Sequence, residues 1–125
     1  MQRILLIDDE EQFCWMMKSM IEEIGCYQVI IATNGTAGLK TARKVVPDLI
    51  LLDVEMPGMK GHEVLRKLNK LRKTRQIPVI MVTGIDTDES ITEATFDFAE
   101  QYIVKPVDLH SLRRAIERAL VYNYA

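Results

Sequence analysis

The chain has 125 residues, of which 48% are hydrophobic, and its 16 Lys and Arg against 18 Asp and Glu give a formal net charge of −2. This length and composition predict one globular domain over residues 1–125 and exclude a disordered or fibrous chain, while the charge offers no general attraction to nucleic acid or anionic lipid. The apolar runs are too short to span a membrane and the N-terminus lacks a signal-peptide pattern, so we expect a cytoplasmic protein that keeps Cys14 and Cys26 reduced.

Strand-like and helix-like stretches alternate along the whole chain. Runs of large aliphatic residues without polar alternation are typical of parallel strands buried on both faces. This alternation predicts an α/β domain in which right-handed crossovers place helices on both faces of a parallel sheet. The expected strands are 4–7, 27–32, 48–53, 78–84 and 102–106, and the expected helices are 13–24, 35–46, 61–71, 88–98 and 108–120.

Helical spacing predicts which side chains face the core. Apolar residues recur at three- and four-residue steps in the amphipathic stretches, and Asp108 is expected to cap the last helix. Both histidines, His62 and His110, are expected on helix surfaces. The expected inward residues are Phe13, Met16, Met17, Met20, Ile21 and Ile24 of the first helix, Val64, Leu65, Leu68 and Leu71 of the third, and Leu109, Leu112, Ile116 and Leu120 of the last.

Polar side chains end the strands at one edge of this sheet. Because the carboxyl ends of parallel strands open on the same side, we expect convergence there of Asp8, Asp9, Asp53, Thr83 and Lys105. Taken alone, Asp53 fits the cap of the following turn equally well, but an edge that gathers three carboxylates, a hydroxyl and a lysine indicates a site. Clustered carboxylates raise the pKa of at least one of them unless a cation lies among them. Mg²⁺ fits best, since it takes oxygen ligands and keeps waters that a phosphate can replace.

Other chemistries are disfavoured at this edge. No His or Cys is expected near it, which argues against zinc and against Ser/His/Asp or Cys/His catalysis. Nucleotide- and flavin-binding folds place glycines or hydroxyls after the first strand, where backbone amides hold phosphate. This chain has Asp8 and Asp9 there, which would repel a bare phosphate but not a phosphate that arrives with a metal ion.

Four segments resemble the receiver domain of two-component response regulators, a family that includes the single-domain chemotaxis regulators of bacteria. The acidic pair, the Asp-x-x-Met-Pro-x-x-x-Gly run, the strand-end Thr and the Lys-Pro pair are each common, but together they are specific. The resemblance implies a flavodoxin-like (βα)5 three-layer sandwich whose five-stranded parallel sheet has the order 2-1-3-4-5. The matching segments are 4–10, 47–61, 78–84 and 102–106.

The resemblance also implies roles for the acidic residues. Asp53 matches the phosphoacceptor, an aspartate nucleophile that forms an acyl phosphate. Asp9 and Asp53 match the carboxylates that bind Mg²⁺ in the family. Asp8 would act mainly through water, and the backbone carbonyl of Glu55 would complete the protein ligands.

Three further matches concern the response to phosphorylation. Lys105 matches the cation that pairs with the phosphoryl group, and the bond from Lys105 to Pro106 is usually cis in the family. Thr83 matches the hydroxyl that turns in to meet the phosphate. Tyr102 matches the aromatic residue that changes rotamer together with it.

These matches predict a phosphorylation-dependent signalling switch more than an enzyme. Asp53 would take phosphate from a histidine kinase, a phosphotransfer protein or a small phosphodonor with Mg²⁺, and would lose it by self-catalysed hydrolysis. The surface around residues 84–105 would then rearrange. Besides the kinase, the expected partner is a downstream protein or a fused output domain. Phosphorylation could also lead to homodimerisation, and no membrane binding is expected. The sequence leaves open whether the chain stands alone or belongs to a longer protein.

Three alternative functions fit the sequence less well. A phosphate-independent interaction module would keep the fold but is expected to lack the acceptor or the lysine, and both are present. An aspartate-based phosphatase usually carries Asp-x-Asp, whereas Asp53 is followed by Val54 and Glu55. Nucleic-acid binding by residues 60–75, which hold seven basic residues and one Glu, is disfavoured because no aromatic residues are interleaved.

Two surface features have more than one interpretation, and one segment departs from the family's usual sequence. Trp15 lies outside the inward face of the first helix, on the surface that receivers present to their kinase. Its side chain either contacts a partner or folds over neighbouring side chains, and the sequence does not decide between these roles. Residues 86–100 contain six acidic residues and no basic residue. This acidic segment either forms an output surface for a basic partner or only balances the basic helix and keeps the protein soluble. Phe98 and Ala99 stand where most receivers have Gly-Ala, so we predict a short, shifted or mobile helix near 88–98.

Overall fold

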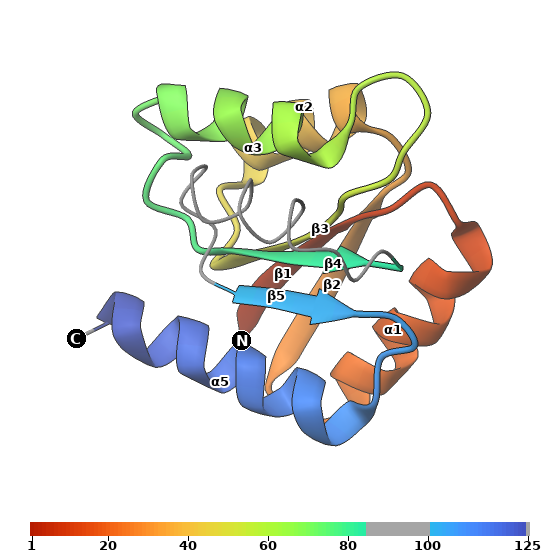
Figure 1. Cartoon of the computed structure of the whole chain (residues 1–125). Coiled ribbons are helices and arrows are strands. Elements are labelled where there is room, and N and C mark those ends of the chain that lie inside the picture. The colour runs from red at the N-terminus through yellow and green to blue at the C-terminus, as the bar shows by residue number, and fades with distance from the viewer. Residues whose placement is uncertain (85–100, 125) are drawn as a thin grey trace.

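The computed structural model describes residues 1–84 and 101–124 and shows a three-layer α/β sandwich (Figure 1). Its five strands pair in parallel in the order β2-β1-β3-β4-β5, which confirms the predicted fold class and strand order. Helices α2 and α3 cover one face of the sheet, and α1 and α5 cover the other (Figure 1). The elements are β1 (Gln2–Ile7), α1 (Glu11–Glu23), β2 (Tyr27–Ala32), α2 (Gly35–Val45), β3 (Leu49–Asp53), α3 (Gly61–Lys70), β4 (Val79–Thr83), β5 (Gln101–Val104) and α5 (Leu109–Tyr124).

Strand side chains are buried alternately on the two faces of the sheet. In β1, Ile4 and Leu6 pack in the core beside α1 and α5, whereas Leu5 and Ile7 pack in the core beside α2 and α3. Every residue of β3 and of β4 is buried. This two-sided burial is the physical reason for the unbroken aliphatic runs, because a polar side chain on either face would lose its water.

The parallel register brings the strand ends level at the carboxyl edge of the sheet. Asp8 directly follows the last pair of β1 with β3, so it lies beside Asp53, and Lys105 directly follows the last pair of β4 with β5. The backbone N–H of Lys105 donates to the carbonyl of Thr83 at 2.6 Å, which extends that pairing by one residue. The pairs at this edge are Ile7 with Leu52, Asp53 with Val82, and Thr83 with Val104.

Side-chain caps and one strained residue mark the helix ends. Asn34 accepts a hydrogen bond from the N–H of Ala37 at 2.8 Å at the start of α2. Asp108 accepts from the N–H of Ser111 at 2.9 Å, which confirms the predicted cap of α5. Helix α2 ends at Val46, whose φ of 47° lies in the left-handed region that favours glycine. A β-branched residue in this conformation costs about 1–3 kcal/mol.

Two of the predicted inward residues are instead exposed, and the buried line of α1 includes a cysteine that was not predicted to face inward. The buried line of α1 runs through Cys14, Met17 and Ile21. Met16 lies about 100° around the helix from Met17 and is 46% exposed. Leu109 is 42% exposed. It is the first residue of α5, and the helix is not yet packed against the sheet at that point. Trp15 is 62% exposed, as its position off the inward face predicts.

His62 was expected on a helix surface but is buried. It is the second residue of α3, directly after Gly61. A Cβ at position 61 would overlap the backbone oxygen of Asp53 and lie 2.8 Å from the Cα of Val54, so α3 begins in direct backbone contact with the end of β3. This close approach, which only glycine permits, draws the first turn of α3 onto the sheet and covers the histidine.

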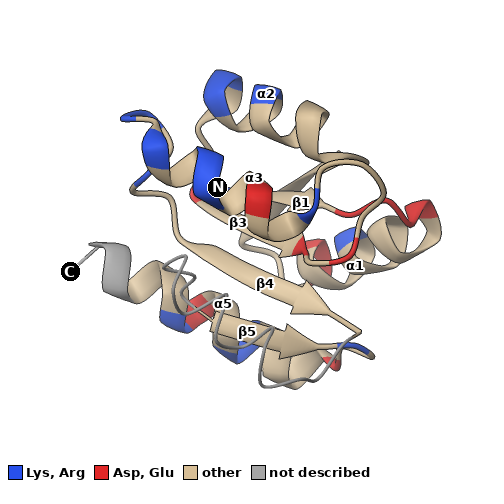
Figure 2. Ribbon diagram, turned by 45° about the horizontal axis from the view of Figure 1, so that its top comes forward, with Lys and Arg blue, Asp and Glu red and all other residues tan. Residues whose placement is uncertain are grey.

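Charge is unevenly distributed over the two helical layers. Lys and Arg residues gather on α2 and α3 and on the segment after α3, whereas several acidic residues lie at the loop before α1 (Figure 2). Among the described residues, no helix combines the length and the apolarity that crossing a membrane requires. The helix predicted near 88–98, with its altered Phe98 and Ala99, falls outside the described residues.

Candidate functional site

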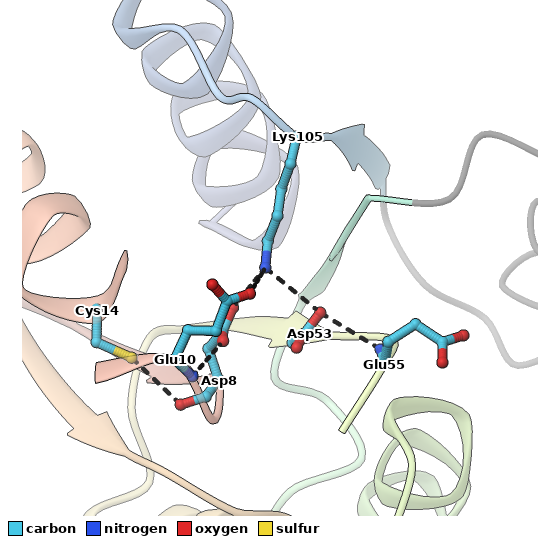
Figure 3. Close-up of polar contacts among 6 residues, drawn as sticks. All are labelled: Asp8, Glu10, Cys14, Asp53, Glu55 and Lys105. Atoms are coloured by element: carbon cyan, nitrogen blue, oxygen red, sulfur yellow. Dashed lines mark hydrogen bonds and ion pairs between the residues drawn. The ribbon is translucent and has the colours of Figure 1, made fainter. Parts of the chain in front are cut away.

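An acidic cluster with one lysine lies at the carboxyl edge of the sheet (Figure 3). Asp8 follows β1, Asp53 ends β3, and Lys105 reaches in from the connection between β5 and α5. The Lys105 Nζ lies 3.1 Å from Asp8 Oδ2 and 3.7 Å from Asp53 Oδ1. Glu10 adds a third carboxylate, with its Oε1 at 3.5 Å from the same nitrogen. Residues far apart in the chain thus meet at the edge that the sequence predicts.

Asp53 and Asp8 are almost completely removed from solvent. Asp8 is 0% exposed and Asp53 is 2% exposed. Burial, followed by the negative charge of Asp8, raises the pKa of Asp53 to about 7. Burial also raises the pKa of Asp8, against the opposing hydrogen bonds from the Glu10 N–H and from Lys105. Asp53 therefore keeps its proton to a higher pH than an exposed carboxyl group does.

Lys105 is the cation that partly balances these acids. Burial by itself lowers the pKa of Lys105, but its hydrogen bond to Asp8 and the charges of Asp53, Asp8 and Glu10 raise the pKa above the usual value. The ammonium therefore stays charged at neutral pH. One positive charge beside several carboxylates leaves the cluster negative, so the site favours a further cation.

Backbone amides orient the two buried carboxylates. The N–H of Glu10 donates to Asp8 Oδ1 at 2.9 Å, and the N–H of Glu55 donates to Asp53 Oδ1 at 3.3 Å. Each donor is two residues after its acceptor, the local pattern by which an Asp fixes the turn that follows a strand. Figure 3 shows the Glu55 backbone nitrogen directed at Asp53 and its side chain directed away. The turns therefore hold both carboxylates at the sheet edge.

Three aspartates could hold a metal ion here. Asp8, Asp9 and Asp53 each offer an oxygen atom, and these atoms all lie within 4.8 Å of one another. Opposite ligands of an octahedral Mg²⁺ are about 4.2 Å apart, so small side-chain rotations would close the set around such an ion. An all-oxygen donor set fits Mg²⁺ and not zinc, which prefers His and Cys.

Cys14 lies closer to the site than the sequence predicts. Its Sγ donates to the backbone carbonyl of Asp8 at 3.3 Å (Figure 3), because the first turn of α1 packs beside the end of β1. The expectation that no cysteine approaches this edge is therefore wrong. Burial, followed by the charge of Asp8, raises the pKa of Cys14 to about 11, so the group is a protonated thiol and a poor metal ligand.

Two other neighbours of Lys105 were not predicted. Glu10 forms the ion pair described above, and the ring centroid of Phe13 lies 4.2 Å from the Lys105 Nζ. These two residues are three positions apart and therefore lie on the same side of the chain as it enters α1. In the sequence, both residues follow closely after the Asp8–Asp9 pair, but no motif marks either of them as a neighbour of the lysine.

The remaining predicted residues lie at or near the same edge. Thr83 is the buried last residue of β4, and its carbonyl accepts from the N–H of Lys105. Tyr102 pairs with Met81 two positions before the end of β4, is half-buried, and packs against the core beside α2 and α3. Tyr102 therefore lies two positions before the strand end at which the acidic cluster is found. The Lys105–Pro106 bond is cis, as the resemblance implies.

A five-stranded parallel α/β sandwich with a buried acidic cluster and a lysine at its carboxyl edge defines a receiver-like signalling domain. The sequence model of the response regulator receiver domain matches residues 4–117. The chain therefore belongs to the response regulator receiver family of two-component signalling.

Similar proteins support this assignment. PilH of Pseudomonas aeruginosa is 38% identical over 120 residues, which cover 96% of this chain and 98% of that protein. The transcriptional regulatory protein ZraR of Escherichia coli is 32% identical over 98% of this chain, but the match covers only 27% of ZraR. Among solved structures, the chemotaxis protein CheY4 of Vibrio cholerae superposes with a TM-score of 0.90 at 28% identity, covering 96% of this chain and 99% of that chain.

Family membership carries general properties. Receiver domains are phosphorylation-dependent signalling switches and not classical enzymes, and they generally bind Mg²⁺ in an acidic pocket. Relatives of this domain act with histidine kinases and output domains. The chain spans nearly all of PilH but about a quarter of ZraR, so it matches both single-domain and multidomain relatives.

Proposed function

We propose that Asp53 accepts a phosphoryl group from a histidine kinase, a phosphotransfer protein or a small phosphodonor, and that this modification switches the partner surface of the protein. The observation that carries the proposal is the buried Asp53 carboxylate at the sheet edge, 3.7 Å from the Lys105 ammonium and grouped with Asp8 and Asp9. A phosphate-independent interaction module is not favoured, because the acceptor and the lysine are both present and in contact.

The residues of this site would perform an in-line phosphoryl transfer. One carboxylate oxygen of Asp53 attacks phosphorus, the bond from phosphorus to the donor atom breaks, and an acyl phosphate forms on Asp53. The burial that raises the pKa of Asp53 to about 7 would keep part of the acceptor protonated and inactive at neutral pH. Positive charge beside the cluster shifts the carboxyl toward the ionised nucleophile, and Lys105 supplies part of that charge.

Mg²⁺ is the proposed cofactor. The carboxylates of Asp9 and Asp53, Asp8 directly or through water, and the backbone carbonyl of Glu55 would hold it. When bound, the ion supplies charge neutralisation and orients the phosphoryl oxygens. The same site would return the group to water by slow self-catalysed hydrolysis, so the protein acts as a switch with a limited lifetime.

The proposed signal is a rearrangement around Thr83 and Tyr102. A phosphoryl group adds about −1.5 to −2 charges and three acceptor oxygens at the sheet edge. The Thr83 hydroxyl and the Lys105 ammonium would move to donate to it, and Tyr102 would change rotamer with Thr83. Because the Lys105 N–H is bonded to the Thr83 carbonyl, the ends of β4 and β5 would respond together.

The proposed partners follow from this switch. The protein would act in the cytoplasm. Its partners would be a histidine kinase or phosphotransfer protein upstream, and a downstream protein or an output domain of the same polypeptide. Homodimerisation on phosphorylation is a further outcome to be measured by sizing. Nucleic acid is not a proposed partner, since the basic side chains of α2 and α3 are not interleaved with aromatic residues.

Radiolabelled acetyl phosphate with Mg²⁺ tests the assignment. We expect label on the wild-type protein and none on Asp53→Asn. Asp108→Asn is the matched control, because it makes the same chemical change at an exposed helix cap where Asn also caps. Equal labelling of Asp53→Asn and wild type would show that another residue is the acceptor.

A further inference from the structure

The Lys105 ammonium has two kinds of neighbour in this structure. The carboxylates of Asp8, Glu10 and Asp53 lie 3.1, 3.5 and 3.7 Å from its nitrogen. The Lys105 nitrogen also lies over the ring of Phe13, with the ring centroid 4.2 Å from this atom. This distance is well inside the range in which an aromatic face attracts a cation.

Phe13 is a fixed support and not a loose side chain. It lies in the first turn of α1 and packs against the hydrophobic core between the sheet, α1 and α5. The Lys105 side chain above it is 17% exposed. Attraction between a cation and an aromatic face is stronger where water is largely excluded, so this contact holds the ammonium more firmly than a surface contact would. Glu10 is weaker by the same reasoning, since its side chain is 66% exposed.

The carboxylate contacts of Lys105 conflict with metal binding. Asp8 and Asp53 belong to the group whose oxygen atoms could hold a cation. A divalent ion there would take over the negative charge of both carboxylates and repel the ammonium. The ring of Phe13 offers no oxygen ligand to a hard cation, so the metal does not compete for it. The contacts with the Phe13 ring and with Glu10, which lies outside that group, therefore remain when the aspartates are engaged, and of the two only the Glu10 contact involves a largely exposed side chain.

We propose that Phe13 is a positioning residue for Lys105, whose ring face keeps the ammonium beside Asp53 when a divalent cation occupies the aspartates. This inference rests on the proposed function of the site and adds a residue to it. Without the ring, the four rotatable bonds of the lysine side chain would let the ammonium swing toward solvent. Phosphoryl transfer would then lose a pre-positioned charge.

A graded series at position 13 tests the proposal without changing side-chain shape. Phe13 is replaced site-specifically by 4-fluoro-, 3,5-difluoro- and 3,4,5-trifluorophenylalanine, which progressively weaken the negative face of the ring. The rate of Asp53 labelling by acetyl phosphate should fall in steps, to about fivefold below wild type for the trifluoro ring and for Phe13→Leu. Phe13→Trp, which keeps an aromatic face, should retain the rate. Thermal unfolding midpoints confirm that each variant folds.

Lys105→Met provides the matched control for the series. If Phe13 acts through the ammonium, fluorination should have no effect on the residual labelling rate in the Lys105→Met background, so that the two changes are coupled. An equal slope in that background would show that fluorine acts through shape or through the phosphodonor, and would overturn the proposal.

Nuclear magnetic resonance provides a readout that does not depend on phosphorylation. The Cε protons of Lys105 should be shifted upfield by the ring current of Phe13, and the shift should disappear in Phe13→Leu. The proposal predicts that the shift persists in the wild-type protein at saturating Mg²⁺. Loss of the shift on Mg²⁺ addition would overturn it.

The outcomes separate this inference from the proposed function. A labelled wild-type protein with a flat fluorine series would overturn the role of Phe13 and leave Asp53 as the acceptor. A wild-type protein that takes no label would overturn the proposed function, and the role of Phe13 would fall with it.

Discussion

Replacing Asp53 with Asn is expected to stabilise the fold at neutral pH. Burial, followed by the negative charge of Asp8, raises the pKa of Asp53 from 3.8 to about 7. The folded protein thus keeps this proton over a pH range in which the unfolded chain has already released it. Because the folded-state pKa is the higher of the two, stability falls as the pH rises from about 4 to about 7 and is then constant.

The separation between these two pKa values sets the size of the effect. At ~1.36 kcal/mol for each pKa unit, a shift from 3.8 to about 7 corresponds to ~4 kcal/mol of lost stability at pH 7. The attraction of the Lys105 ammonium, 3.7 Å away, is already contained in this pKa, so the offset comes from burying the Asn amide with incomplete hydrogen bonds. The net stabilisation expected for Asp53→Asn is therefore about 2–3 kcal/mol, a large share of the 5–15 kcal/mol typical of a domain.

Urea unfolding of both proteins without divalent cations, at about pH 4.5 and about pH 7.5, measures this difference. The gain for Asp53→Asn should be near zero at the lower pH and complete at the higher pH. Asp108→Asn is the control, because its hydrogen bond from the Ser111 N–H holds the pKa of Asp108 below the usual value, so any pH effect there has the opposite sign. A gain for Asp53→Asn that is equal at both pH values would refute the reasoning.

Two further predictions concern residues away from the acceptor. Val46→Gly should raise the free energy of unfolding by about 1 kcal/mol in urea titrations, because glycine adopts the left-handed backbone conformation without strain. Lys44→Gly, inside α2, should lower the free energy of unfolding by about 1 kcal/mol. A lower free energy of unfolding for both variants would contradict this account. Ellman's reagent should react quickly with exposed Cys26 and slowly with buried Cys14, whose pKa is raised to about 11, until urea exposes both thiols; rapid reaction of both thiols in the folded protein would disprove the burial of Cys14.

The structural context of several residues could not be predicted from their own sequence patterns. Cys14 and Phe13 become neighbours of the acidic cluster because α1 packs beside the end of β1, and His62 is buried because Gly61 lets α3 approach the backbone of Asp53. Helical spacing alone placed Met16 inward, but the direction of a helix against its sheet decides which of several apolar residues form the buried line. These outcomes depend on how whole elements pack, and packing is not a local property.

The sequence by itself determined the order of strands and helices and the edge at which their polar residues gather. The helical spacing of apolar residues, aliphatic runs and turn residues are local signals, and parallel connectivity then forces the strand ends to one side. Only the tertiary structure decided the chemistry of that edge. Lys105 meets Asp8 across 97 positions of the chain, and the removal of both carboxylates from water raises their pKa values. Desolvation and charge contact arise from the surrounding packing, so no single segment contains them.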